Sequence, residues 1–486
     1  MTKNYINNNA YIGIMTFIRY KKFGRKEYAY EVIAYWDPVQ KKPRQKSRYL
    51  GVVIDKEKKI FSRMEKRQSA EKLILDFGDV YLLYEFMKCK GVVSLLEGVF
   101  GDRARYLIAL LCYRLCHASA MDYAKVWYDG SFSRFLFKDV NLSSQRVSDF
   151  LRDIGDESVQ RDFFKQYIPS FTDAKDGVII DSTALPNQIH IPFNMWGYSD
   201  SDIEKQIRFL FVVDRKSSLP LFFRYLPGNI VDVSSLGFTV EELKKFGVKS
   251  SFVLVDSGFF SEDNIKGLNT EKIDFLTRLP SSRVVYKKLV REEVGMLESF
   301  KNAVRCGERV LFIKQKKISL FGKDAYAHIV LDPERKGRET KKFLLEALDQ
   351  ETDEGDIEFK LMKKGVMILV SSFKLKKEEV VPFYYLRQTV ERLFGFSKDD
   401  LKIIPLRSHK EETLRGFLLL MFIALVVFVQ LKKAIGEKHT VEGVLLTMRN
   451  LKCKVYDDEI LIQELAKQQK DITEELKVIM PKKLGI

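Results

Sequence analysis

The spacing of apolar residues changes along the chain and divides it into regions. Residues 1–62 alternate aromatic or β-branched residues with polar ones, most clearly at 11–18 and 27–36. This period of two predicts a β-rich N-terminal region. From 63 to 172 apolar residues recur every three or four positions, which predicts a helical region.

Short apolar runs return between 173 and 280, and their order is informative. The expected strands cover residues 178–181, 207–213, 219–226, 252–256 and 275–279, with a helix at 236–246. The second and third strands are joined by a hairpin sequence. Three antiparallel strands, a helix, and two further strands linked by a helix form the ribonuclease H-like order. Only a closing helix is missing, and residues 382–398 supply it.

The remaining segments complete an α/β multidomain prediction. A ribonuclease H-like core made of 173–280 and 373–432 is interrupted by a β-rich insertion at 281–372. A helical C-terminal tail is expected at 433–486. The apolar run 416–429 has about 14 residues, short of the roughly 20 needed to span a bilayer, so it is interpreted as a buried core helix.

Two aspartates end strands of this predicted core. Asp181 follows the first strand and Asp256 follows the fourth, at the carboxyl ends where α/β sheets place ligands. Because these strands are neighbours in the predicted order, the two carboxylates should converge, and Glu391 of the closing helix is the natural third member. Carboxylates are ligands that Mg²⁺ prefers, and two such ions about 3.5 to 4 Å apart support phosphodiester cleavage and transfer.

The closing helix carries a polar stripe. Tyr384, Arg387, Glu391 and Lys398 are spaced by three, four and seven residues, so they share one face of a helix. Arg387 could bind a phosphate with its fork of donors, and Lys398 could add a point charge. The alternative is surface decoration, with Arg387 and Glu391 paired across one helical turn.

Charge and cysteine content narrow the class of partner and the compartment. The formal net charge of +16 favours a polyanion, most commonly nucleic acid, over an unspecialised basic surface. Five scattered cysteines without a C-x-x-C pair indicate a reducing compartment. No secretion signal or membrane partner is expected, so a cytoplasmic location follows.

Two further segments could contact DNA. Residues 41–48 are interpreted as a loop with five cations, which either follow a phosphate backbone or form a solvated turn: Lys41, Lys42, Arg44, Lys46 and Arg48. Gln145 and Arg146 lie in the first turn of a capped helix. That helix either belongs to a helix-turn-helix-like reader or is an ordinary one.

The motifs together resemble a known family. Asp181-Ser182-Thr183, the segment Asp256 to Ser261, and the Y-R-E-K spacing of the closing helix are similar to those of DDE transposases from bacterial insertion sequences. The similar group is the cut-and-paste group with a β insertion before the last acid, and the resemblance extends over essentially the whole chain.

This resemblance implies specific roles. Asp181, Asp256 and Glu391 would bind two Mg²⁺ or Mn²⁺ ions, and Tyr384 would join the two stripe cations in contacting DNA phosphates. The protein would cleave terminal inverted repeats of double-stranded DNA and transfer strands into target DNA. It would act as a homodimer on paired ends, in the nucleoid-associated cytoplasm of a bacterium or archaeon. Regions 1–62 and 63–172 would contact DNA and bind its ends, respectively.

Two alternatives remain open. One is a non-catalytic or domesticated DNA-binding protein derived from a transposase, and the other is a stand-alone ribonuclease H-like nuclease.

Some family members also stack a flipped base on a tryptophan of the insertion, whereas Trp36, Trp127 and Trp196 all lie outside it here.

Overall fold

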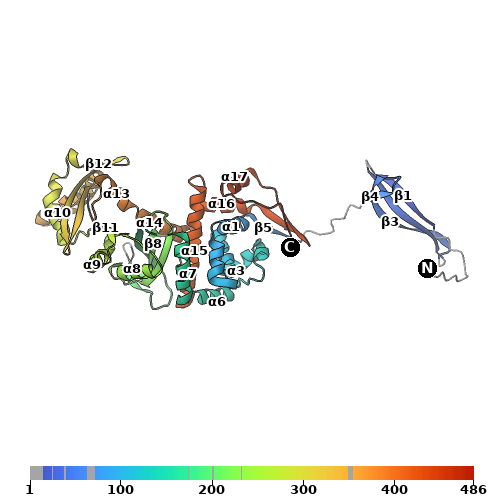
Figure 1. Ribbon diagram of the computed structural model, residues 1–486, viewed down its shortest axis with the longest axis horizontal. Helices are drawn as coiled ribbons and strands as arrows, with labels where there is room; N and C mark the ends of the chain where they lie inside the picture. Colours follow the sequence, from blue (N-terminus) through green and yellow to red (C-terminus); the bar gives the residue numbers. More distant parts are fainter. Residues whose placement is uncertain are drawn as a thin grey trace. The chain divides into compact units, whose positions relative to one another are not determined.

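A computed structural model of the chain describes residues 15–23, 26–37, 40–62, 72–172, 174–199, 202–230, 232–348 and 354–485 (Figure 1). The chain forms two compact units. The first comprises Met1–Lys72 with Tyr456–Asp458, and the second comprises Leu73–Val455 with Glu459–Ile486.

The first unit contains an antiparallel four-stranded sheet, as the period of two predicts. Its strands follow one another in the order of the chain: β1 (Met15–Phe23), β2 (Lys26–Asp37), β3 (Lys42–Asp55) and β4 (Ile60–Ser62). The start of the strand expected at 11–18, before residue 15, lies outside the described residues.

The interpretation of residues 41–48 as a loop is wrong. β3 already begins at Lys42 and pairs with β2 through Arg48, opposite Glu31. The cations from Lys42 to Arg48 occupy every second position, so they project from one face of the strand, and all are exposed. The sequence interpretation relied on the charge of these residues, which is typical of an exposed turn. Their spacing of two residues is that of a strand. We call the five cations of residues 41–48 the basic segment.

Helices form the N-terminal part of the second unit. They are α1 (Gly78–Cys89), α2 (Val92–Phe100), α3 (Ala104–His117), α4 (Ala124–Gly130), α5 (Ser133–Leu136), α6 (Ser144–Ile154) and α7 (Glu157–Phe171). Of these, α3 and α6 pack against α15 (Glu411–Ile435), and aromatic residues of α7 contact Phe422 of α15, which is buried along most of its length. α15 is long and apolar enough to cross a membrane, but 83% of its apolar window is buried inside the protein, so it is a core helix as expected.

The central sheet has the predicted ribonuclease H-like order. Its core strands are β6 (Val178–Pro186), β8 (Asp202–Asp214), β9 (Pro220–Pro227), β10 (Phe252–Val255) and β11 (Asp274–Arg278). They are arranged as β9-β8-β6-β10-β11, with β6, β10 and β11 parallel and β8 antiparallel to β6 and β9. Helix α8 (Leu236–Lys245) precedes β10, and α9 (Glu262–Thr270) connects β10 to β11. A short strand not foreseen from the sequence, β7 (Met195–Ser199), forms a hairpin with β8.

The insertion extends this sheet. It contains α10 (Val284–Glu293), β12 (Ala303–Cys306), β13 (Arg309–Leu320), β14 (Lys323–Leu331), α11 (Pro333–Leu348), α12 (Glu354–Met362) and β15 (Val366–Ser371). β15 pairs with β11, and β14 pairs with β15, so the inserted strands and the core share one ten-stranded sheet. The insertion therefore shares hydrogen bonds with the strand that follows the second aspartate.

The closing helix is not continuous, contrary to the prediction for 382–398. α13 (Lys377–Tyr385) and α14 (Gln388–Gly395) are separate, and a π-helical turn at Phe396–Asp400 follows. Between α13 and α14 the backbone forms hydrogen bonds between residues three apart, as in a 3₁₀-helix. One example is the bond from the Arg387 amide to the Tyr384 carbonyl. Such local changes of winding leave the apolar spacing nearly intact, so the sequence does not reveal them.

The prediction of a helical C-terminal tail is only partly right, because the tail also contains strands. It contains α16 (Val441–Arg449), β16 (Lys452–Val455), β17 (Glu459–Ile462), α17 (Lys467–Glu475) and β18 (Lys483–Gly485). β16 pairs with β5 (Leu73–Asp76), so the two ends of the second unit share a small sheet. Strands of three or four residues are too short to show a period of two.

Candidate active site

The parallel pairing of β6 and β10 brings the two aspartates together. Ile180 pairs with Val255, so the next residues along each strand, Asp181 and Asp256, are neighbours. Asp181 is only 7% exposed, and its Oδ1 accepts a hydrogen bond of 2.9 Å from the Ser182 amide. Thr277 of β11 donates to the Asp256 carbonyl at 3.3 Å. The sheet thus places two carboxylates side by side.

Arg387 lies among three carboxylates. Its Nη1 is 2.7 Å from Asp181 Oδ2 and 3.8 Å from Asp256 Oδ2, and its Nη2 is 2.8 Å from Glu391 Oε1. Because one guanidinium contacts all three, the carboxylates of two strands and one helix face a common point. We call these three carboxylates the triad.

The other two stripe residues also reach this edge of the sheet. The Tyr384 hydroxyl donates to Asp256 Oδ1 at 2.9 Å, and Lys398 Nζ donates to Thr183 Oγ1 at 2.9 Å. Thr183 lies on the same face of β6 as Asp181 because it is two residues further along the strand. The expectation that a strand ends at Asp181 is wrong, because β6 continues to Pro186 through its pairing with β8. The break between α13 and α14 and the π-turn still direct the four stripe residues towards the middle of β6 and the end of β10.

The electrostatics of the site reflect burial and mutual charge. Burial raises the pKa of Asp181 to about 6, although the nearby Arg387 guanidinium acts in the opposite direction. Burial alone would lower the pKa of Arg387, but the charges of Asp181 and Asp256 raise it above its usual range. Burial, followed by the negative charge of Asp256, raises the pKa of the Tyr384 hydroxyl. Tyr384 is therefore a neutral donor at physiological pH.

The triad has the chemistry of a divalent-cation site. Its donors are hard carboxylate oxygens, and a cationic group already lies among them. Within the described ranges no group of three or more histidine, cysteine, aspartate or glutamate residues is arranged to hold a metal ion as it stands. The guanidinium of Arg387 takes the central place, so the residues fit a metal once this side chain moves aside.

The other candidate residues lie outside the triad. Gln145 donates to Asp149 Oδ1 at 3.1 Å within α6, and Arg146 is exposed on the same helix. The basic segment belongs to the first unit. Within the described residues of the second unit, neither Gln145 nor Arg146 contacts a triad carboxylate.

Sequence reasoning missed an aromatic residue on the sheet face that carries Asp181. Trp196 of β7 pairs with Lys205 of β8, and Phe211, six residues further along β8, pairs with Asp181. Residues an even number of positions apart on a strand point to the same face of the sheet, and so do residues paired directly across two strands. Trp196 and Asp181 therefore lie on the same face of the sheet. Trp196 is 62% exposed, and Lys205 Nζ lies 5.9 Å from its ring. The short hairpin between β7 and β8 was the available signal.

A comparison with family models identifies the part of the chain that contains this site. Residues 172–427 match the family model described as "Transposase DDE domain", and this range contains the whole triad. A solved structure of a piggyBac transposase synaptic complex with hairpin DNA is similar at 14% identity. The similarity covers 76% of this chain and 78% of that chain, with a TM-score of 0.43. A comparison with curated proteins found no match.

Proposed function

The chain belongs to the transposase DDE domain family, whose model matches more than half of its length, and from this premise we propose that Asp181, Asp256 and Glu391 form its metal-binding triad. As a member of this family the protein is an enzyme of DNA transposition, which cleaves DNA and transfers strands. The observation that carries the assignment of the triad is the contact of one guanidinium with all three carboxylates.

The proposed roles follow from position and chemistry. Asp181, within β6, and Asp256, directly after β10, hold divalent ions from adjacent strands, and Glu391 completes the site from α14. When bound, two such ions supply activation of the attacking hydroxyl and stabilisation of the leaving oxygen. Arg387 leaves the carboxylates and forks onto a DNA phosphate, while Lys398 adds a point charge and Tyr384 orients Asp256.

We further propose the finer identity and partners. The Y-R-E-K spacing supports membership of the cut-and-paste group of bacterial insertion sequences, with Mg²⁺ or Mn²⁺ as the ion. The proposed DNA partners are terminal inverted repeats and target DNA, bound by a homodimer in the cytoplasm. A net charge of +16 and the exposed basic segment support contact with the DNA backbone, and the helices of 63–172 are proposed to bind the DNA ends.

Conservative removal of charge tests the triad. Asp181→Asn, Asp256→Asn and Glu391→Gln should each abolish Mg²⁺- or Mn²⁺-dependent cleavage of a DNA that carries the element's end. DNA affinity should remain because phosphate contacts made elsewhere supply it.

The matched control is Glu379→Gln, an exposed glutamate of α13 that pairs with Lys376. It should cleave normally. Cleavage at the wild-type rate by the Glu391→Gln protein would remove that residue from the triad.

A further inference from the structure

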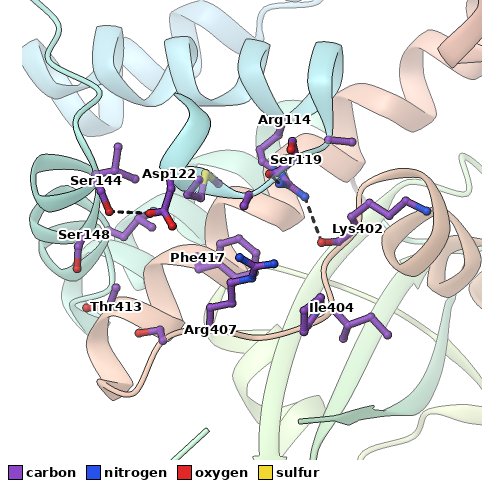
Figure 2. A pocket seen from close by; sticks show the side chains of 17 residues that line it. Arg114, Ser119, Asp122, Ser144, Ser148, Lys402, Ile404, Arg407, Thr413 and Phe417 are labelled. Carbon is purple, nitrogen blue, oxygen red and sulfur yellow. Dashed lines mark hydrogen bonds between the residues drawn. The ribbon is translucent and has the colours of Figure 1, made fainter. Parts of the chain in front are cut away.

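A cavity of about 450 Å³ lies where α3, α6 and the segment leading into α15 meet (Figure 2). Its wall includes the C-terminal part of α3 with the residues that follow it, one side of α6, and residues from Lys402 to Phe417. The last of these segments begins four residues after Lys398. The cavity is therefore built directly onto the end of the Y-R-E-K segment.

A buried arginine without a counterion forms part of the wall. Arg114 is 3% exposed, and its guanidinium donates to the carbonyls of Ser119, Leu401 and Lys402. Its Nε has no hydrogen-bond partner, and no ion pair in the described part of the chain involves it. Burial lowers the pKa of Arg114 to about 10. Carbonyl dipoles satisfy some donors but leave a full positive charge unneutralised, which is costly in a protein interior.

The rest of the wall adds to this positive charge. Arg407 also lines the cavity and is exposed, so it is reachable from solvent. Lys402 lines it as well, but its side chain extends away from the cavity (Figure 2). The carboxylate in the wall, Asp122, accepts a hydrogen bond of 2.7 Å from Ser144 Oγ. Two arginines against one carboxylate, in a wall that also contains serine residues, make a site for an anion.

We propose that this cavity binds a backbone phosphate of the DNA on which the enzyme acts, with Arg407 as the main ligand. We assign the phosphate to DNA because the cavity segment follows Lys398 directly in the chain. Arg114 also holds the residues between Lys398 and the cavity in place, since it donates to the Leu401 carbonyl. The choice of DNA rests on the proposed function. The anion site itself rests on the buried charge of Arg114 and on the lining of the cavity.

Arg407→Ala tests the proposal through the salt dependence of DNA binding. Anisotropy of a labelled duplex should show affinity reduced by about tenfold, the scale of a charge-assisted hydrogen bond. The slope of log affinity against log salt should become shallower by about 0.9, the value for one phosphate. Arg407→Lys should recover part of both losses. Arg105→Ala, an exposed arginine of α3 outside the cavity, should change neither.

Asp122→Asn provides a gain of binding that unfolding cannot mimic. It removes the carboxylate from the wall while keeping an acceptor for Ser144, so DNA should bind about two- to fivefold more tightly.

In a parallel arm, thermal melting is measured in inorganic phosphate and in chloride at equal ionic strength. If phosphate stabilises the wild type but not Arg407→Ala while the DNA slope stays unchanged, the site binds free phosphate and the DNA assignment is overturned.

An unchanged slope together with no effect of phosphate overturns the anion site itself. These outcomes are separate from a failure of the proposed function. The triad variants report on cleavage, whereas the Arg407 and Asp122 variants report on binding with the triad intact.

Discussion

Replacing Arg387 by alanine has two opposite consequences, and both follow from its position among the triad carboxylates. The change removes one guanidinium that lies 2.7 Å from Asp181, 2.8 Å from Glu391 and 3.8 Å from Asp256. Without it, three negative charges face one another and Asp181 loses its counterion. The metal-free protein should therefore lose stability, while the place between the carboxylates becomes open to a divalent ion.

The size of the stability loss depends on exposure. Removing one partner of a buried ion pair costs about 3 to 5 kcal/mol, whereas exposed pairs contribute about 0 to 1 kcal/mol. The Asp181 side chain is 10% exposed, but those of Asp256 and Glu391 are 32% and 48% exposed, so solvent screens two of the three contacts. A loss of roughly 2 kcal/mol follows, which should lower the melting temperature by a few degrees.

Metal should reverse this loss more strongly in the variant than in the wild type. In the wild type a divalent ion must displace Arg387, so part of its binding free energy is used to break the ion pairs. In Arg387→Ala no such competition exists, and a metal concentration 100 times the dissociation constant should add about 2.7 kcal/mol of stability. Cleavage should nevertheless fall by roughly 1.5 to 3 kcal/mol of transition-state stabilisation, because a phosphate contact is lost.

The assay is thermal melting with and without Mg²⁺ or Mn²⁺ at matched ionic strength, combined with single-turnover cleavage of a pre-nicked end. Arg392→Ala is the matched control, since this exposed arginine of α14 bonds only weakly to the Gln388 carbonyl, at 3.5 Å. Equal metal-induced shifts in the wild type and in Arg387→Ala would refute the competition. Normal cleavage by Arg387→Ala would return the stripe to surface decoration.

Three further predictions concern other parts of the chain. Replacing the basic segment by alanines should reduce the slope of log DNA affinity against log salt concentration by about 0.9 per lost phosphate contact. An unchanged slope would mean that these residues face solvent and do not contact DNA. Lys398→Ala should slow cleavage about tenfold, because the hydrogen bond from its Nζ to Thr183 places its charge beside the triad; a loss of stability large enough to account for the slower cleavage would indicate a structural role. His328 is fully buried between Gln315 and Ser371, and burial lowers its pKa to about 4. Its stabilising contribution is complete above pH 6.5, the ordinary histidine value, and falls by about 1.4 kcal/mol per pH unit between pH 6.5 and 4. Urea unfolding at pH 7 and pH 5 should show this loss in the wild type and a smaller one in His328→Gln.

The central part of the fold and the triad could be predicted because local and global signals agree there. Apolar runs that end in aspartate gave β6 and β10, and the order of elements made them neighbours. The position of Glu391 came from spacing along one helix. These inferences depend on strands and helices long enough to show a period, and on a known order of elements.

Other features depend on contacts that spacing does not encode. The sequence does not show that β15 pairs with β11, because that pairing is between strands almost 90 residues apart. Nor does it show the place of Arg387 among the carboxylates, because helix spacing alone fits both a phosphate ligand and an ion pair with Glu391. The structure contains that ion pair together with contacts from two strands, a combination that neither sequence interpretation included.

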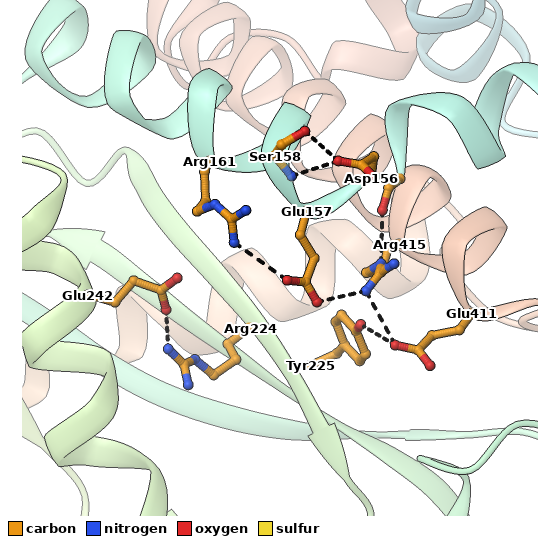
Figure 3. A network of polar contacts seen from close by, with 10 residues as sticks. Asp156, Glu157, Ser158, Arg161, Arg224, Tyr225, Glu242, Glu411 and Arg415 are labelled. Atoms are coloured by element: carbon orange, nitrogen blue, oxygen red, sulfur yellow. Dashed lines mark hydrogen bonds and ion pairs between the residues drawn. The ribbon is translucent and has the colours of Figure 1, made fainter.

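The segment Leu414-Arg415-Gly416 positions the start of α15. Gly416 allows close packing on α6, since a Cβ there would lie 1.8 Å from the Leu151 carbonyl oxygen. Arg415 donates to the Gly155 carbonyl at 2.8 Å and pairs with Glu157 of α7 and Glu411 of α15, and Glu411 accepts from Tyr225 of β9 (Figure 3). This network connects the helical region to the central sheet, so Arg415 and Gly416 contribute to packing between the two.

The place of Arg387 also bears on how the site can exist before it binds metal or DNA. Three carboxylates converging at a partly buried point repel one another, and the raised pKa of Asp181 records the cost of burying a charge there. The guanidinium of Arg387, the residue directly before α14, offsets this repulsion, so the fold does not depend on metal to form. If metal takes over the neutralising role as proposed, Arg387 is released at the point where the DNA phosphate arrives, close to Tyr384 at the end of α13. One side chain then serves the folded apo state and the DNA complex in turn, which couples metal binding to phosphate binding without any change of fold.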